Sequence, residues 1–378
     1  MLEITRITLR EIRLPLREPF RISSGTMVHR RIALLELHDA SGVTAWSECV
    51  ADDLPNYTAE TIDTAWLAIT RWIAPRVIGR QFQAPGEVHS VLAQDFRGHW
   101  MAKAAVEMGM WGVEATRLGV SLARLIGGTR NTIPVGISLG IQQSPEMLVE
   151  KVREALAEGY RKIKLKIMPG KDVAFVRAVR DAFPDAPLMA DANNAYTLDD
   201  ADALEAMDDL NLMMFEQPLA WEDIVRHAAL QQRLRTPICL DESITSLDRA
   251  QDMVTLGAGR LINIKPGRVG GFAESLAIHD YCEANGIPVW CGGMLESGIG
   301  RAYNVALASL SNFQKPGDLS PSARYWSQDV VTPEWTMSTD GMVTVPFDVP
   351  GIGVSVDVHR IDALTVRKET LGSGAAQG

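Results

Sequence analysis

The sequence predicts an α/β fold, namely a modified β/α barrel with an α+β domain that caps it. Between residues 161 and 265, short apolar runs each finish on a charged side chain, at Lys166, Asp191, Glu216, Asp241 and Lys265. These positions follow one another at steps of 25, 25, 25 and 24 residues, about the length of one strand, one helix and two turns. The intervening segments carry apolar residues at three- and four-residue steps, as amphipathic helices do. Regular alternation of buried strands with helices is typical of a β/α barrel.

The first part of the chain predicts a separate α+β capping domain over residues 1–128. Apolar and polar residues alternate in three segments, which predicts an antiparallel meander over residues 3–13, 29–39 and 43–48. A loop with Pro and Gly joins the first two strands at residues 18–27. Helical periodicity follows over residues 58–78, 85–94 and 100–118, and the first helix opens with the capping-box pattern Thr58-Ala-Glu-Thr61.

The barrel is expected over residues 129–331. Its first strand and helix are predicted at residues 133–138 and 145–158, and later helices at 171–183, 198–207, 221–234, 247–256 and 271–285. A strand from residue 288, a helix to about residue 310 and a last strand at 313–319 complete the repeat. Strands and turns return over about 332–370, and we expect this segment to complete the capping domain. The small, polar tail at 371–378 is expected to be disordered.

Composition excludes several functional classes. The net charge of −10 and the pI near 5.3 give no general affinity for nucleic acid or for an anionic membrane. The four cysteines show no C-x-x-C spacing, which favours reduced, buried thiols. The N-terminus starts with charged residues and has no long apolar run, so we expect neither a signal peptide nor a membrane helix, and a cytoplasmic location.

Three of the strand-end residues are acids: Asp191, Glu216 and Asp241. A single acid at a strand end is commonly a helix cap, but three at the same phase of one repeat would repel each other unless a cation joined them. Hard oxygen ligands without His or Cys favour Mg²⁺ or Mn²⁺. We expect Asn193 and Glu242 to orient these ligands without binding the metal themselves.

Lysines form the second part of the predicted site. Lys164 and Lys166 stand two residues apart on one strand, so their side chains face the same way, and Lys265 ends a strand across the barrel. A neighbouring cation is expected to lower the pKa of such a lysine from about 10.4 to about 7–8, which suits a general base. The seven histidines do not fall at strand ends, so a histidine base or ligand is not expected.

This combination favours removal of the proton next to a substrate carboxylate, with the negative charge of an enediolate stabilised by metal and ammonium groups. Lysines on both walls permit racemisation, and loss of a leaving group instead gives dehydration. A Schiff-base aldolase that uses Lys166 or Lys265 as nucleophile remains an alternative, as does a non-catalytic homologue.

The quoted residues resemble those of the enolase superfamily. The motifs are K-I-K-L-K ending at Lys166, D-A-N at 191–193, E-Q-P at 216–218, D-E-S at 241–243 and N-I-K-P-G-R-V-G-G at 263–271. C-G-G-M-L-E-S-G-I-G at 291–300, P-N-Y-T-A-E-T at 55–61 and A-R-Y-W at 323–326 look like the o-succinylbenzoate synthase / N-succinylamino acid racemase branch of the muconate-lactonizing-enzyme subgroup.

The resemblance implies roles for these residues. It implies that Asp191, Glu216 and Asp241 bind the metal, and that Lys166 and Lys265 are the acid/base pair assisted by Lys164. It also implies a small carboxylate substrate, a step of menaquinone biosynthesis or racemisation of N-acylamino acids, and a homo-oligomer (a dimer or an octamer). A muconate cycloisomerase or a dipeptide epimerase remains the alternative within the family, although Asp318-Leu-Ser320 departs from the epimerase pattern Asp-x-Asp. We expect substrate contacts from Phe20, Met27, Tyr57, Ser138, Arg268, Gly293, Met294 and Glu296.

Overall fold

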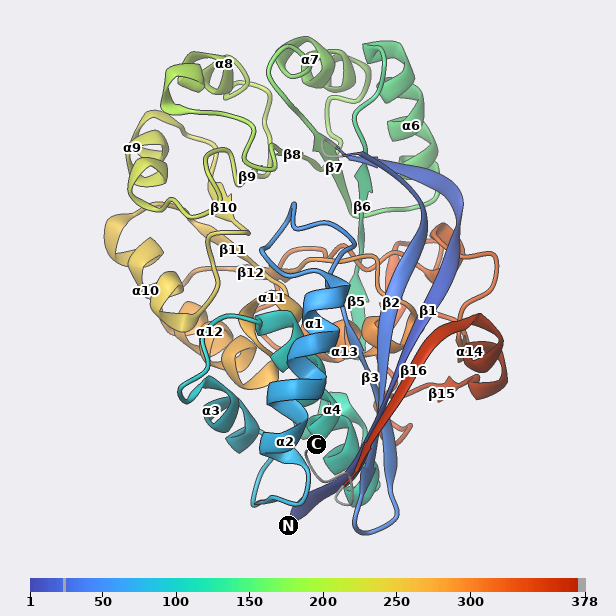
Figure 1. Cartoon of the computed structure of the whole chain (residues 1–378). Coiled ribbons are helices and arrows are strands. Elements are labelled where there is room, and N and C mark those ends of the chain that lie inside the picture. The colour runs from blue at the N-terminus through green and yellow to red at the C-terminus, as the bar shows by residue number, and fades with distance from the viewer. Residues whose placement is uncertain (23–24, 373–378) are drawn as a thin grey trace.

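The protein combines a parallel barrel sheet with an antiparallel sheet at its side (Figure 1). The computed structural model describes residues 1–22 and 25–372, and for residues 19–22 and 25–27 it describes the backbone alone. The antiparallel sheet has the order β16-β1-β2-β3, with β4 paired to β1. Its strands are β1 (Leu2–Ile22), β2 (Gly25–Asp39), β3 (Thr44–Cys49), β4 (Gln81–Phe82) and β16 (Thr365–Gly372). No helix within these described ranges is long and apolar enough to cross a bilayer.

The first two strands extend further than the sequence predicts. Residues 18–27 were expected to form a loop, but β1 continues to Ile22 and β2 starts at Gly25, with Phe20 paired to Met27. The register shifts between Pro15 and Phe20, and this irregularity separates the buried part of the hairpin from its tip. The predicted substrate-contacting side chains of Phe20 and Met27 lie outside the described side chains.

Helices pack on the antiparallel sheet and form a core with it. They are α1 (Ile62–Ala68), a π-helical turn (Ile69–Ile73), α2 (Ala74–Val77), α3 (Glu87–Ala93), α4 (Trp100–Leu118) and α5 (Leu122–Leu125). The predicted start of the first helix at Thr58 is wrong, because Thr61 is the N-cap and exchanges hydrogen bonds with Thr64. The Glu60 side chain interacts with α4 instead, where it accepts hydrogen bonds from the backbone N–H groups of Met101 and Ala102.

The barrel sheet contains seven parallel strands in the order β12-β11-β10-β9-β8-β7-β6. They are β6 (Gly136–Leu139), β7 (Lys162–Lys166), β8 (Leu188–Asp191), β9 (Phe215–Glu216), β10 (Ile238–Leu240), β11 (Leu261–Ile264) and β12 (Val289–Cys291). Helices join successive strands (Figure 1): α6 (Pro145–Ala157), α7 (Val173–Ala182), α8 (Ala201–Glu205) after a 3₁₀ turn (Leu198–Asp200), α9 (Val225–Arg233), α10 (Leu247–Leu256), α11 (Pro266–Val269), α12 (Phe272–Ala284) and α13 (Gly298–Ala308). The periodicity of the sequence therefore predicted the strand–helix repeat correctly.

Among the described residues, the barrel closes without an eighth regular strand. The expected strand at 313–319 is wrong as a strand, since this segment makes only isolated bridges, from Phe313 to Val289 and from Gly317 to Val135. The Asp318 N–H donates to the carbonyl of Cys291 at 2.9 Å, and the Gly136 N–H donates to the carbonyl of Gly317 at 2.7 Å. The segment thus joins the two edge strands, β12 and β6, with a few hydrogen bonds.

The C-terminal segment returns to the first sheet. Strand β16, red in Figure 1, lies beside β1, and Thr370 pairs with Thr8. The remaining short elements are β5 (Thr132–Pro134), β13 (Val331–Thr332), β14 (Met342–Thr344), β15 (Ser355–Val356), α14 (Val358–Leu364) and a 3₁₀ turn (Ser322–Arg324). The expectation of a disordered tail from residue 371 is wrong at its start, because Leu371 and Gly372 belong to β16. Residues 373–378 lie outside the described residues.

A carboxylate of the first sheet holds a barrel helix at its N-terminus. Glu48, near the end of β3, accepts hydrogen bonds from the N–H groups of Ser297 and Gly300, both at 3.1 Å. These groups open α13, where the unpaired N–H groups and the helix dipole favour a negative charge. The contact fixes β3 against the loop that follows β12.

A second carboxylate, on α4, caps the N-terminus of another barrel helix in the same way. Glu107 accepts hydrogen bonds from the N–H groups of Phe272 at 2.7 Å and Ala273 at 3.0 Å, at the start of α12. The preceding residue is Gly271, with φ at +120°, and a Cβ there would lie 2.1 Å from Glu107 Oε2. Glycine is therefore needed for this approach.

Replacing Glu107 with alanine is expected to lower the free energy of unfolding by about 2–4 kcal/mol. The change leaves two helix N–H groups and the indole N–H of Trp111 without the acceptor they now have. Urea unfolding followed by circular dichroism measures the effect. Glu150→Ala on α6, which removes an exposed i,i+3 pair with Arg153, serves as control and should cost less than about 1 kcal/mol. Equal losses in the two variants would contradict the assigned contact.

Candidate active site

Three carboxylates lie side by side at the carboxyl ends of adjacent barrel strands. Asp191 ends β8 and Glu216 ends β9, and the two residues pair across the parallel ladder. Asp241 directly follows β10. All three side chains are buried, with at most 1 % of their surface exposed. The spacing in the sequence predicted this convergence, because carboxyl ends of parallel strands share one rim of a barrel.

Two lysines of β7 reach these acids. Lys164 Nζ lies 3.3 Å from Asp191 Oδ2 and 3.1 Å from Glu216 Oε2, so it bridges the two carboxylates. Lys166 Nζ donates to Asp191 Oδ2 at 2.6 Å and to Asn193 Oδ1 at 2.5 Å. The intervening Leu165 packs in the hydrophobic core on the other side of the strand.

Asp241 is bound by groups from two parts of the chain. Lys265, which follows β11, donates to Asp241 Oδ2 at 2.8 Å. Arg268 of α11 forms an ion pair with Asp241 Oδ1, and the hydroxyl of Tyr57 donates to the same oxygen at 3.0 Å. Tyr57 precedes α1, so the capping domain contributes directly to this part of the barrel mouth.

Asn193 and Glu242 connect the acids to their surroundings. The N–H of Asn193 donates to Asp191 Oδ1 at 3.0 Å, and its amide nitrogen lies 3.4 Å from Glu242 Oε1. Asn194 donates to the same Glu242 oxygen at 3.2 Å. Glu242 Oε2 is buried without a hydrogen-bond partner among the described residues.

Burial and mutual repulsion perturb the acids in different directions. Burial, together with the neighbouring Asp191, raises the pKa of Glu216 to about 8, and burial beside Asp241 raises the pKa of Glu242 to about 7. The pKa values of Asp191 and Asp241 are lowered, because nearby ammonium and guanidinium groups outweigh the effect of burial.

Two of the active-site lysines, Lys164 and Lys265, have raised pKa values. Burial alone would lower the pKa of Lys265, but attraction to Asp241 and Tyr57 raises it above its ordinary value. The pKa of Lys164 is raised for the same kind of reason, by Asp318, Glu216 and Asp191. The two ammonium groups are paired with carboxylates, and this pairing outweighs the effect of burial. The lowering of a lysine pKa beside a bound cation stays a prediction.

These pairings engage carboxylate oxygens of all three acids. Among the described residues, no group of three Asp, Glu, His or Cys side chains stands close enough to hold one metal ion. The sequence predicted such a group from the strand ends. The strand ends do converge, and their carboxylates are engaged by cationic side chains: Lys164 contacts both Asp191 and Glu216, and Asp241 contacts Lys265 and Arg268.

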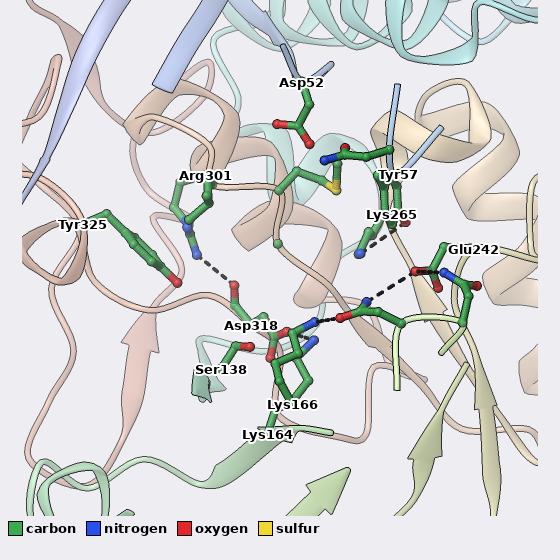
Figure 2. Close-up of a pocket in the computed structure, with 16 residues that line it drawn as sticks. Asp52, Tyr57, Ser138, Lys164, Lys166, Glu242, Lys265, Arg301, Asp318 and Tyr325 are labelled. Carbon is green, nitrogen blue, oxygen red and sulfur yellow. Dashed lines mark hydrogen bonds and ion pairs between the residues drawn. The ribbon is translucent and has the colours of Figure 1, made fainter. Parts of the chain in front are cut away.

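Above the acids lies a pocket lined by both barrel and capping domain (Figure 2). Lys166 and Lys265 both point into it, and their strands, β7 and β11, are separated by three strands of the sheet. The predicted residues that line the pocket are Tyr57, Ser138, Lys164, Lys166, Asn193, Glu242, Lys265, Gly293 and Met294. The Oγ atom of Ser138 is buried without a hydrogen-bond partner among the described residues.

Two predicted substrate contacts lie elsewhere. Glu296 is buried behind the pocket, where it accepts a hydrogen bond from the Met294 N–H at 2.7 Å and so shapes the loop after β12. Arg268 lies beneath Tyr57 and lines a separate cavity beside α4. Both residues therefore support groups that line the pocket.

Sequence reasoning missed several lining residues: Asp52, Asn56, Asn194, Leu295, Arg301, Asp318 and Tyr325. Most lie on loops, where no periodicity indicates direction. A signal did exist for one further residue, Lys162, which continues the two-residue spacing of Lys164 and Lys166 along β7. It is fully buried, with Nζ 3.4 Å from the centre of the Trp290 ring.

Comparisons with known proteins agree with this architecture. Residues 147–360 match the family described as "Enolase C-terminal domain-like", and residues 4–127 match "Mandelate racemase / muconate lactonizing enzyme, N-terminal domain". The chain belongs to the enolase superfamily. It is 48 % identical to the o-succinylbenzoate synthase of Bacillus subtilis over 357 residues, covering 94 % of this chain and 95 % of the relative.

This enolase-superfamily enzyme is also similar, over nearly its whole length, to a racemase and to a protein of known structure. The N-succinylamino acid racemase of Thermus thermophilus is 45 % identical over 365 residues, which cover 97 % of this chain and 98 % of the relative. A crystal structure of an enolase-superfamily member from Listeria innocua superposes with a TM-score of 0.95 at 40 % identity, covering 98 % of this chain and all of that one. Relatives with two different activities are thus about equally similar.

Proposed function

We propose that this enzyme removes the proton next to a carboxylate in a metal-dependent reaction, as an o-succinylbenzoate synthase, an N-succinylamino acid racemase, or both. The observation that carries the proposal is the placement of Lys166 and Lys265 in one pocket, on strands separated by three others, above three buried acids. The names of relatives at 45–48 % identity support the same two activities.

The donor set fits a hard divalent cation. The three acids are carboxylates at the carboxyl ends of adjacent barrel strands, and all three side chains are buried. Carboxylate oxygens are what Mg²⁺ and Mn²⁺ prefer, and we assign Asp191, Glu216 and Asp241 as the ligands. A cation held there would neutralise negative charge that develops on a substrate carboxylate.

The remaining chemistry belongs to the lysines. When neutral, Lys166 or Lys265 accepts the α-proton, and the other, when charged, returns a proton to the opposite face of the same carbon. Lys164, buried beside Asp191 and Glu216, supplies a positive charge next to the developing anion. Return of a proton to the opposite face gives racemisation. Dehydration occurs instead when the enediolate expels a β-hydroxyl group, which leaves as water with a proton from a lysine ammonium group.

We also propose a cytoplasmic homo-oligomer, a dimer or an octamer. The four cysteines are buried and unpaired, a state that a reducing compartment preserves. Light scattering on the purified chain tests the assembly.

Incubation of an N-succinylamino acid with the enzyme and Mg²⁺ in D₂O is expected to exchange its α-proton. NMR follows the loss of the α-proton signal, and polarimetry follows racemisation of the same sample. The cyclohexadiene precursor of o-succinylbenzoate, assayed in parallel, separates dehydration from racemisation.

EDTA is expected to stop exchange and Mg²⁺ to restore it, because the three acids then lose the cation that balances them. Turnover that continues in EDTA, with a lysine trapped by borohydride, would instead indicate Schiff-base chemistry and would refute the proposal.

A further inference from the structure

A third lysine lies below the two that the reaction uses. Lys162, Lys164 and Lys166 alternate along β7, and all three side chains lie on the interior side of the strand. The ammonium group of Lys162 lies over the ring of Trp290, which belongs to a small inner layer with Met189, Met214, Cys239 and Leu261. A fully buried ammonium needs a counter-charge.

Asp318 supplies that counter-charge and shares it with Lys164. Asp318 Oδ1 lies 3.0 Å from Lys162 Nζ, and Oδ2 lies 2.5 Å from Lys164 Nζ. The backbone of Asp318 is held at both ends: its N–H donates to Cys291, and its carbonyl accepts from Arg301 Nη1 at 3.0 Å. Figure 2 shows the Asp318 side chain reaching from this segment to the lysines of β7.

Lys164 therefore contacts three carboxylates: Asp191, Glu216 and Asp318. The first two are the groups that the proposed function assigns to the metal, and a divalent cation beside them repels an ammonium group. Asp318 makes the shortest of these three contacts and is not among the residues assigned as ligands.

We propose that Asp318 is a positioning residue that holds Lys164 while Asp191 and Glu216 bind the metal. This inference rests on the proposed function. Lys162, fixed over Trp290, occupies the other oxygen of Asp318 and so keeps the carboxylate in place. Without Asp318, Lys164 competes with the cation for Asp191 and Glu216.

A double-mutant cycle on the full chain tests this, with the dissociation constant for Mn²⁺ measured by titration calorimetry. Asp318→Asn is expected to weaken Mn²⁺ binding about 10-fold, a coupling typical of residues in one charged network. In a Lys164→Met background, where no ammonium group competes, the same substitution should change the dissociation constant less than about twofold. Equal penalties in both backgrounds would overturn the proposal, since Asp318 would then act only through its own charge.

Lys162→Met is the matched control, because Lys162 contacts Asp318 but neither metal ligand. In this background, Asp318→Asn should still weaken Mn²⁺ binding. If the weakening disappeared, Asp318 would act only through Lys162, and the proposal would be overturned. The single variant Lys164→Met should bind Mn²⁺ more tightly than the unaltered chain, and this test does not require the Asp318 variant to fold. Weaker Mn²⁺ binding by Lys164→Met would also overturn the proposal. If the unaltered chain bound no Mn²⁺, the proposed function would fail first; binding without the predicted coupling would refute this inference alone.

Discussion

Alanine at position 265 is expected to abolish racemisation of an N-succinylamino acid, with kcat lower by about 10²–10⁴-fold. Lys265 lies on the wall opposite Lys166, so its loss removes proton transfer at one face of the substrate carbon. Lys166 remains and can still exchange the α-proton of one enantiomer, with retention of configuration. Chiral chromatography, combined with deuterium incorporation for each enantiomer, measures both effects.

The stereochemical pattern distinguishes a lost base from a damaged fold. Lys166→Ala should preserve exchange of the other enantiomer, so the two variants should show opposite enantiomer selectivity in this assay. Lys151→Ala, on the exposed face of α6, is the control and should leave both rates unchanged. Loss of exchange for both enantiomers in both lysine variants would contradict a base on each wall.

Asparagine at position 241 is expected to reduce turnover by more than about 10³-fold and to lower the free energy of unfolding by about 3–5 kcal/mol. Asp241 neutralises Lys265 and Arg268, and both are buried. Asparagine keeps the size of the side chain but leaves two buried cations without a counter-charge. Steady-state kinetics and thermal unfolding measure the two losses.

The effect on stability should depend on pH. The pKa of Asp241 is lowered in the folded protein, chiefly because Lys265 and Arg268 outweigh the opposing effect of burial. Its stabilising contribution is therefore present above the ordinary carboxyl pKa and is lost as the pH falls through the lowered value. The difference in the free energy of unfolding between the Asp241→Asn variant and the unaltered protein should be constant near neutral pH. It should become smaller only in strong acid. Asp280→Asn, at an exposed position of α12, should show neither loss.

Several elements were predictable because their signal is local. The 24- and 25-residue steps from Lys166 to Lys265 reflect one strand and one helix per repeat, and each strand end was located within a residue or two. The segment at 313–319 was not predicted correctly, because its bonds to β12 and β6 depend on where those edges come to lie. The hairpin tip at 18–27 was also misread: Pro and Gly indicate turns, yet the paired strands extend past them.

The sequence by itself determined which groups reach the barrel mouth. In parallel strands the side-chain direction alternates and the carboxyl ends share one rim, so Lys164, Lys166, Asp191 and Glu216 had to lie near one another. Tertiary structure alone decided how the charges pair. Tyr57 reaches Asp241 from a domain 184 positions away in the chain, and Asp318 lies between Lys162 and Lys164. These contacts depend on distances between segments far apart in sequence, and periodicity along the chain carries no information about such distances.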